Sequence, residues 1–200
     1  MMSKEKRKVT VLYPGGFKPL TGAHIQMIDK YLKHPDVDRL VLFISPGKRD
    51  VVSALDAYRI IEGVLKDRNI EIVLDKNSYS PILAVYRWIE HPDRNPGKYA
   101  LASSSKGDDY KRVKEFTRNY EMDKFGKNLP EGVKVVELPV DTEPLLYPNG
   151  DPISATRARK DLKNKDYKSF KENYPGLGDN HIGFIWKHLI QKSWEEQQVT

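Results

Sequence analysis

Short β-branched and aromatic runs alternate along the chain with segments whose apolar residues recur at helical spacing. The runs expected to form strands are 9–13, 39–45, 70–74, 98–103 and 133–140. The segments expected to form helices are 23–33, 53–65, 80–88, 108–120, 153–162, 167–173 and 179–197. The run RLVLFIS at 39–45 shows no polar alternation, which is typical of a parallel strand covered on both faces.

This order of elements predicts an α/β fold: a doubly wound, Rossmann-like, five-stranded parallel sheet with a C-terminal helical extension. We expect residues 1–200 to form a single domain, with its core in 9–162 and the C-terminal helices in 163–200. Ligands of such sheets bind beyond the carboxyl ends of the strands, near the point where the strand order reverses. The segments that follow strands, where candidate chemistry is expected, are 14–24, 46–49, 103–109 and 141–156.

Composition narrows the class of protein. Of the 200 residues, 38% are hydrophobic and 31% are charged, which is typical of a globular domain. No apolar run approaches the roughly 20 residues of a membrane helix, and no secretory leader follows the basic N-terminus, so we expect a cytoplasmic protein without a membrane partner. The absence of cysteine excludes disulfides, thiolate nucleophiles and cysteine-ligated zinc. The net charge of +6 favours polyanionic partners such as nucleotides or nucleic acids.

The first candidate site is the loop GGFKPLTGAH at residues 15–24. The paired Gly15 and Gly16 allow the backbone to approach a ligand closely. Thr21 can cap the next helix, whose first N–H groups and dipole attract an anion. His24 lies three residues later on the same side of the first turn, where an imidazole donor suits a triphosphate. Taken alone, the loop also fits an ordinary strand–helix turn, and it matches neither GxxxxGK[ST] nor GxGxxG.

The second candidate site is the segment ISATRAR at residues 153–159. Ser154 or Thr156 can cap a helix and present hydroxyl and N–H donors to phosphate. Arg157 and Arg159 add guanidinium forks that suit phosphate oxygens. Taken alone, this segment also fits an ordinary capped basic helix.

Together, the two segments resemble the signatures of the nucleotidylyltransferase superfamily, a G-x-F-x-P-x-[HT]-x-G-H loop and an I-S-S-T-x-x-R helix start. The resemblance spans most of the chain, because the strands and helices between the motifs also fit. Lys18 stands where the superfamily has Asp, Asn or Gln, and Ala23 stands where it prefers glycine. The resemblance implies nucleotide binding by Gly15, Gly16, Phe17, Lys18, Thr21, Lys106, Ser154, Thr156 and Arg157.

The motif layout is most similar to the phosphopantetheine adenylyltransferase branch, and viral members with unassigned acceptors share it. That branch reads SPSKKPMFTLEER after its second strand, where this chain reads SPGKRDVVSALD with one extra residue. The similarity places Lys48 at the lysine that bridges the acceptor phosphate and the α-phosphate. It places Lys106 in an arginine-bearing loop after the fourth strand. Because Ser103 and Lys106 replace arginines of that branch, the resemblance does not assign the acceptor.

The resemblance implies transfer of a nucleoside monophosphate, with AMP favoured, from a nucleoside triphosphate to a phosphate-bearing acceptor, with release of pyrophosphate. His24 would donate a hydrogen bond to the α-phosphate, Lys48 would bridge it to the acceptor, and Arg159 would hold the β- and γ-phosphates. Mg²⁺ is expected with the triphosphate. The sequence shows no compact carboxylate cage, so no protein ligand of a metal is predicted.

Other functions remain open at this point. One is cytidylyl transfer from CTP to an alcohol or sugar phosphate, and another is adenylyl transfer to nicotinamide mononucleotide, because no motif specifies the base or the acceptor. A third is non-catalytic nucleic-acid binding through residues 157–171, which carry seven basic and two acidic residues. That run alone fits a solvated helix face, and no aromatic-rich platform for single strands accompanies it. The sequence is compatible with a homo-oligomer and does not say whether the helix at 179–197 docks on its own domain.

Overall fold

A computed structural model describes residues 9–121 and 128–198 of the chain. The chain divides into two compact units. Unit 1 takes its described residues from 1–15, 28–45 and 68–142, and unit 2 takes them from 16–27, 46–67 and 143–200. The helix α1 (Gly22–Lys33) begins in unit 2 and ends in unit 1. The expectation of a single domain stays a prediction.

Unit 1 contains a five-stranded sheet in which every pair of neighbouring strands is parallel. Its strands are β1 (Val9–Gly15), β2 (Val37–Ile44), β5 (Ile70–Leu74), β6 (Gly97–Leu101) and β7 (Val133–Val135). The order across the sheet is β5-β2-β1-β6-β7, which is the order of a doubly wound, Rossmann-like fold and confirms the predicted fold class. The strand order reverses between β1 and β6, so the carboxyl ends of these two strands flank the switch point.

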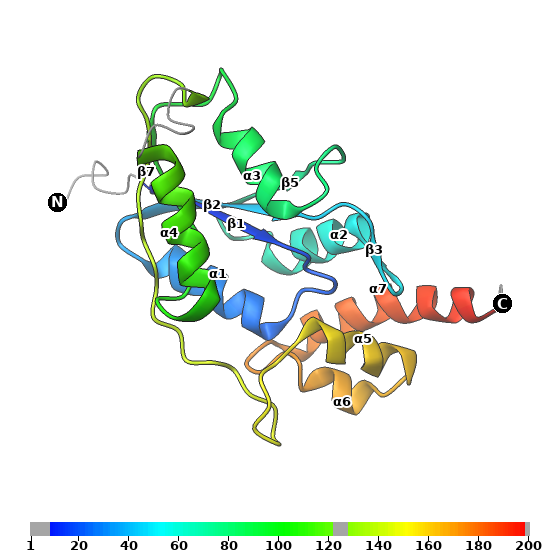
Figure 1. Cartoon of the computed structure of the whole chain (residues 1–200). Helices are drawn as coiled ribbons and strands as arrows, with labels where there is room; N and C mark the ends of the chain where they lie inside the picture. The colour runs from blue at the N-terminus through cyan, green and yellow to red at the C-terminus, as the bar shows by residue number, and fades with distance from the viewer. Residues whose placement is uncertain (1–8, 122–127, 199–200) are drawn as a thin grey trace. The chain divides into compact units, whose positions relative to one another are not determined.

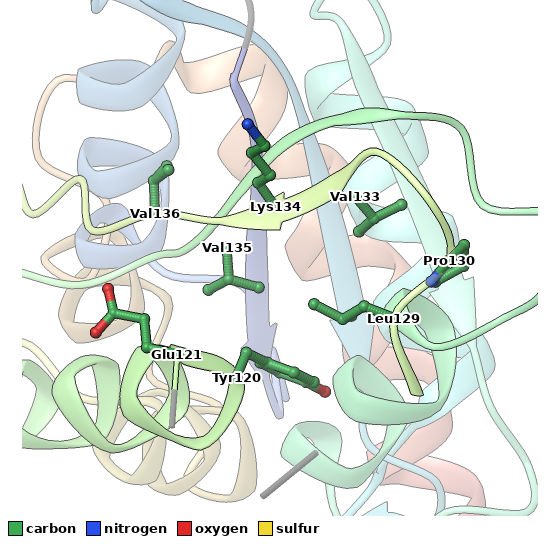
Figure 2. A pocket seen from close by; sticks show the side chains of 8 residues that line it. All are labelled: Tyr120, Glu121, Leu129, Pro130, Val133, Lys134, Val135 and Val136. Atoms are coloured by element: carbon green, nitrogen blue, oxygen red, sulfur yellow. The ribbon is translucent and has the colours of Figure 1, made fainter. Parts of the chain in front are cut away.

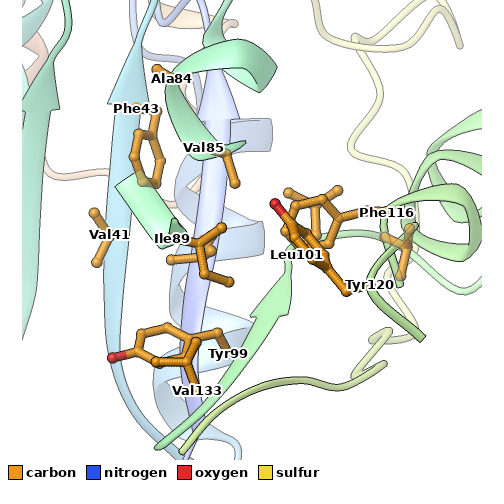
Figure 3. Close-up of a cluster of buried hydrophobic side chains, with 12 residues drawn as sticks. Val41, Phe43, Ala84, Val85, Ile89, Tyr99, Leu101, Phe116, Tyr120 and Val133 are labelled. Carbon is orange, nitrogen blue, oxygen red and sulfur yellow. The ribbon is translucent and has the colours of Figure 1, made fainter. Parts of the chain in front are cut away.

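The helices α3 (Pro81–Ile89) and α4 (Gly107–Glu121) supply one side of the core of unit 1. Figure 3 shows this cluster, in which side chains of α3 and α4 meet those of the strands. Its buried members are Leu12, Val41, Phe43, Ala84, Val85, Ile89, Tyr99, Leu101, Val113, Phe116, Tyr120 and Val133. The alternate strand residues Val11, Leu40 and Leu42 are fully buried too and point to the opposite face. The sheet is therefore buried on both faces, as the unbroken apolar run of β2 predicts.

The last strand is shorter than the predicted run of 133–140. Its ladder with β6 ends at Val135, and Val140 then makes an isolated bridge with Ser104. Between them, the Leu138 carbonyl lies 2.8 Å from the Tyr31 hydroxyl, and Pro139 has no N–H to donate. A side chain of α1 and a proline thus replace the ladder that the apolar pattern alone favours.

Unit 2 is mainly helical. It contains α2 (Ala54–Leu65), α5 (Ala155–Lys163), α6 (Tyr167–Lys171) and α7 (Asp179–Gln198), together with a hairpin of β3 (Lys48–Arg49) and β4 (Val52–Ser53). The helix α7 packs against α2 and α5 (Figure 1). The helices predicted at 153–162, 167–173 and 179–197 are present to within two residues at each end, whereas the apolar pattern does not predict the hairpin.

Candidate functional site

The orientation of His24 is set by its own loop in unit 2. The Thr21 backbone N–H donates to His24 Nδ1 over 3.0 Å, and the Thr21 hydroxyl, expected to cap α1, lies 3.2 Å from the same nitrogen. The Phe17 ring packs against the imidazole at a centroid distance of 4.9 Å. Because Nδ1 accepts from a main-chain N–H, the neutral ring carries its proton on Nε2. Burial lowers the pKa of His24 to about 4, so the ring is a neutral Nε2–H donor at pH 7.

The start of α1 is held by the segment that precedes α7. The Gly22 N–H donates to the Asn173 carbonyl over 2.8 Å. A Cβ at Gly22 would lie 2.9 Å from Pro175 Cδ and 3.0 Å from the Asn173 carbonyl oxygen. Only glycine therefore allows this approach, and Asn173 is a supporting residue that no local sequence signal indicates.

Arg159 joins the two candidate segments. Its Nη1 donates to the Lys18 carbonyl over 2.8 Å, and its Nη2 lies 3.3 Å from the Thr156 hydroxyl. Its Nε donates to Asp50 Oδ2 over 2.8 Å. The first loop, the β3–β4 hairpin and α5 thus meet at one guanidinium, and the Arg159 side chain is 15% exposed. The structure brings together segments that are more than 100 positions apart in the sequence.

Three further cations lie in the two segments that Arg159 joins, and we call Lys18, Lys48, Arg49 and Arg159 the cationic cluster. The Lys18 side chain is buried, with only 3% of the residue exposed. Burial lowers the pKa of Lys18, and the charge of Arg49 lowers it further. Lys48 is exposed and pairs in register with Ser53 in the hairpin. The cluster offers positive charge to an anion, and the Asp50 carboxylate lies beside Arg159.

The N-terminus of α5 adds backbone donors. Ser154 caps this helix, with its hydroxyl accepting from the Arg157 N–H over 3.3 Å. The N–H groups of Ala155 and Thr156 belong to the first turn, which has no intrahelical acceptors for them. The first turn contains no acidic residue, so its dipole favours an external anion.

Arg157 lies in a different environment from Arg159. Its Nη2 donates to Glu172 over 2.5 Å and to the Ser169 hydroxyl over 3.1 Å. The guanidinium stacks over the Tyr147 ring, with Cζ 3.8 Å from the centroid. With Tyr147 and Glu172 it lines a cavity of about 450 Å³. These contacts hold Arg157 against α6, and its expected role in nucleotide binding stays a prediction.

Two expected site residues belong to unit 1. Gly15 ends β1, and its carbonyl accepts from the Ser45 N–H over 3.1 Å. Lys106 directly precedes α4, and its carbonyl accepts from the Ser104 hydroxyl over 3.0 Å. Gly15 lies at the carboxyl end of β1 and Lys106 follows that of β6, the two strands that flank the switch point, and their roles stay predictions.

Unit 1 also has a hollow that contains none of the expected site residues. Figure 2 shows it between β7 and the end of α4, with Val135 facing Glu121 and Tyr120 while Lys134 points to the other side of the strand. Its remaining lining residues are Leu129, Pro130, Val133 and Val136. One carboxylate, one lysine and one tyrosine among apolar side chains do not form a catalytic constellation.

A buried carboxylate supports the hairpin of the site. Asp56 is 1% exposed and accepts from the Ser53 N–H over 3.0 Å and from the Ser53 hydroxyl over 2.8 Å. His188 Nε2 lies 3.1 Å from its other oxygen, which also accepts from Lys192. Burial alone would raise the pKa of Asp56, but hydrogen bonds from Lys192, Ser53 and His188 outweigh burial and hold it at about 2. Through Asp56, the helix α7 is thereby linked to Ser53, the last residue of β4.

Within residues 9–121 and 128–198, no three His, Asp or Glu side chains gather in a way that could hold a metal ion. In the same part of the chain, no helix combines the length and apolar character needed to cross a membrane.

No family model matches the chain, and neither does any curated protein. Among solved structures, it is similar to Plasmodium falciparum nicotinic acid mononucleotide adenylyltransferase complexed with APC or with NaAD. That match has a TM-score of 0.50 and 16% identity, and covers 90% of this chain and 96% of the other.

A second similar structure is a bifunctional NMN adenylyltransferase/ADP ribose pyrophosphatase from Francisella tularensis, with a TM-score of 0.50 and 15% identity. This match covers 92% of the present chain and 53% of the bifunctional one. At these identities the comparisons show a shared fold.

Proposed function

We propose that the protein is a nucleotidylyltransferase that transfers a nucleoside monophosphate from a nucleoside triphosphate to a phosphate-bearing acceptor and releases pyrophosphate. The observation that carries this proposal is the position of His24. It is a neutral donor oriented by Thr21, in the loop whose Lys18 carbonyl is bonded to Arg159. A preset donor beside a cluster of cations suits a reaction in which negative charge develops on a phosphoryl group.

In the proposed reaction, an acceptor phosphate oxygen attacks the α-phosphorus in line. The new P–O bond forms as the bond from the α-phosphorus to the bridging oxygen breaks, and pyrophosphate leaves with that electron pair. No covalent enzyme intermediate is required, so the chain contributes positioning and charge stabilisation. His24 Nε2–H donates to a non-bridging α-phosphate oxygen, and Lys48 bridges that phosphate and the acceptor.

The remaining phosphates are assigned to the cationic cluster and to α5. Arg159 and Lys18 hold the β- and γ-phosphates, and the N–H groups of Ala155 and Thr156 add donors at the helix N-terminus. Lys106 is kept as a further phosphate ligand on the ground of the sequence alone. Neutral His24 donates without adding charge, whereas the cations offset the charge of the leaving group.

Mg²⁺ is proposed to enter with the triphosphate. Mg²⁺ commonly keeps several waters and binds through substrate phosphates, so such an ion would be held mainly by phosphate oxygens and water. The ion would offset phosphate charge, and every step above is assigned to residues of the chain.

The fold comparison supports AMP as the transferred group. Adenylyltransferases of nicotinic acid mononucleotide and of NMN share this fold, and one of them is complexed with NaAD. We therefore propose ATP as the donor and a mononucleotide as the first acceptor to examine. CTP with an alcohol or sugar phosphate is the alternative pair.

The proposal is tested by pyrophosphate release with Mg²⁺, each of the four nucleoside triphosphates and a panel of phosphorylated acceptors. The panel contains nicotinic acid mononucleotide, nicotinamide mononucleotide, pantetheine phosphate, and choline, glycerol and sugar phosphates. Release that requires one triphosphate and one acceptor supports the proposal and names both substrates. Salt-sensitive binding of RNA or DNA without triphosphate binding would contradict it and favour the nucleic-acid alternative.

A further inference from the structure

Asp50 is an acidic residue that directly follows two basic ones. Lys48 and Arg49 form β3, and the Asp50 carboxylate accepts from Arg159 Nε over 2.8 Å. The Asp50 side chain is 69% exposed, whereas that of Arg159 is 15% exposed. The carboxylate can therefore return to water at little cost, while the guanidinium stays in place and needs an anionic partner.

The other contacts of Arg159 explain why, among its partners, only Asp50 can be exchanged for a ligand. The Lys18 carbonyl and the Thr156 hydroxyl are neutral acceptors on two different segments, and together they fix the plane of the guanidinium. The third acceptor, on Nε, is the one that carries charge. A phosphate oxygen is the natural replacement for a carboxylate oxygen at such a fork.

We propose that Asp50 is a phosphate surrogate: its carboxylate occupies the phosphate position at Arg159 in the nucleotide-free protein and leaves when the triphosphate binds. The inference rests on the proposed function and identifies a positioning residue of the same site. In the free protein, Asp50 offsets repulsion within the cationic cluster and keeps Arg159 aligned for phosphate. When the triphosphate arrives, its like charge repels the carboxylate into the solvent that it already faces.

Thermodynamic linkage gives the direction in which removal of the Asp50 charge changes the affinity for triphosphate. Removing the Asp50 charge destabilises the free protein but leaves the triphosphate complex unchanged, because Asp50 has already left Arg159 there. The variant must then bind triphosphate more tightly by the same factor by which its free state is destabilised. The charge-assisted hydrogen bond that is lost corresponds to about tenfold in affinity.

The test variant is Asp50→Asn. Asp50 has a positive φ of 50°, a left-handed conformation that asparagine also adopts, so the hairpin is retained. Asp50→Gly, which suits this conformation better, serves as a second variant. The matched control is Asp179→Asn, which makes the same charge change at an exposed carboxylate paired with Lys171 over 3.2 Å.

The measurement is isothermal titration calorimetry with inorganic tripolyphosphate and with ATP–Mg²⁺. We expect Asp50→Asn and Asp50→Gly to bind both ligands about tenfold more tightly than the wild type, and Asp179→Asn to bind as the wild type does. In an Arg159→Met background, Asp50→Asn should bring no gain. Thermal unfolding should show a lower Tm for Asp50→Asn without ligand and an equal Tm at saturating tripolyphosphate.

Three results would overturn the proposal. The first is unchanged or weaker ligand binding by both Asp50 variants while the wild type binds. The second is an equal gain in affinity in Asp179→Asn, and the third is an undiminished gain in affinity in the Arg159→Met background. A wild type that binds neither tripolyphosphate nor ATP–Mg²⁺ would instead remove the proposed function, and the surrogate role with it.

Discussion

The backbone N–H of Thr21 donates a hydrogen bond of 3.0 Å to Nδ1 of His24, three residues further along the chain. This contact selects the tautomer, because the neutral ring must then carry its proton on Nε2. The segment that starts α1 thus also orients the proposed catalytic donor. The same relationship leads to predictions about both rate and protonation.

Replacing His24 by alanine should lower kcat on the order of 100-fold, because the lost donor acts on charge that develops in the transition state. The KM for the triphosphate should change little, since the cationic cluster is kept. His24→Gln should retain part of the activity, because its amide nitrogen can approach the position of Nε2. The measurement is steady-state pyrophosphate release, with His181→Ala, an exposed residue of α7, as the control. Wild-type turnover in His24→Ala would remove this role.

The protonation of His24 should be visible by NMR. Burial lowers its pKa to about 4, so the chemical shifts of its ring should change near pH 4, whereas an unperturbed histidine titrates at about 6.5. The unfolded chain binds this proton at higher pH than the folded protein does. The contribution of His24 to stability is therefore complete above about pH 6.5 and declines as the pH falls toward 4. Titration of the His24 ring near 6.5 would contradict the buried, neutral donor.

Replacing Asp56 by asparagine should lower the free energy of unfolding by about 3 kcal/mol, because Lys192 and His188 lose their shared buried carboxylate. Urea denaturation at pH 7 measures this change. The control is Asp108→Asn, which removes an exposed pair with Lys111 at 3.4 Å and should change stability by less than about 1 kcal/mol. Equal stabilities of the two variants would show that Asp56 does not anchor α7.

The contribution of Asp56 should also depend on pH. Its pKa is held at about 2, below the ordinary value of 3.8, so its stabilising effect is complete above about pH 4 and is lost as the pH falls through 2. The difference in unfolding free energy between the wild type and Asp56→Asn should therefore be constant from pH 7 to 5 and shrink toward pH 2. A difference that stays the same down to pH 2 would rule out the ionised carboxylate as its source.

Two glycines allow a matched test of close packing. A Cβ at Gly22 would meet Pro175 and Asn173 within 3.0 Å, whereas a Cβ at Gly183 of α7 meets nothing within 4 Å. Gly22→Ala should destabilise the protein by about 1–3 kcal/mol, and Gly183→Ala should stabilise it by up to about 1 kcal/mol. Chemical denaturation of both variants compares them directly. A neutral Gly22→Ala would mean that the loop does not depend on this approach.

The sequence predicts the five strands and their parallel fold class because β-branched runs and helical spacing are local signals. It does not predict the hairpin of β3 and β4, because two-residue strands have no periodicity to detect. The shortening of β7 depends on Tyr31, more than 100 positions away, which no local pattern includes.

The candidate site is likewise predictable from the sequence only in part. The motif residues around His24 and Arg159 were available from spacing and resemblance, and the structure places both in unit 2. Whether Arg157 or Arg159 reaches the first loop depends on the rotation of α5, because residues two apart point to different sides of a helix. The partners Asp50 and Asn173, and the link from Asp56 to α7, come from distant segments and could only be found in three dimensions.

The most direct measurement is label transfer from ATP that carries ³²P at either the α- or the γ-position, to the acceptor that supports pyrophosphate release. We predict that the α-label appears in the acceptor product in proportion to the pyrophosphate formed, that the γ-label stays with pyrophosphate, and that both fall together in His24→Ala. Transfer of the γ-label to the acceptor would show phosphoryl transfer instead and would contradict the proposed nucleotidylyltransferase.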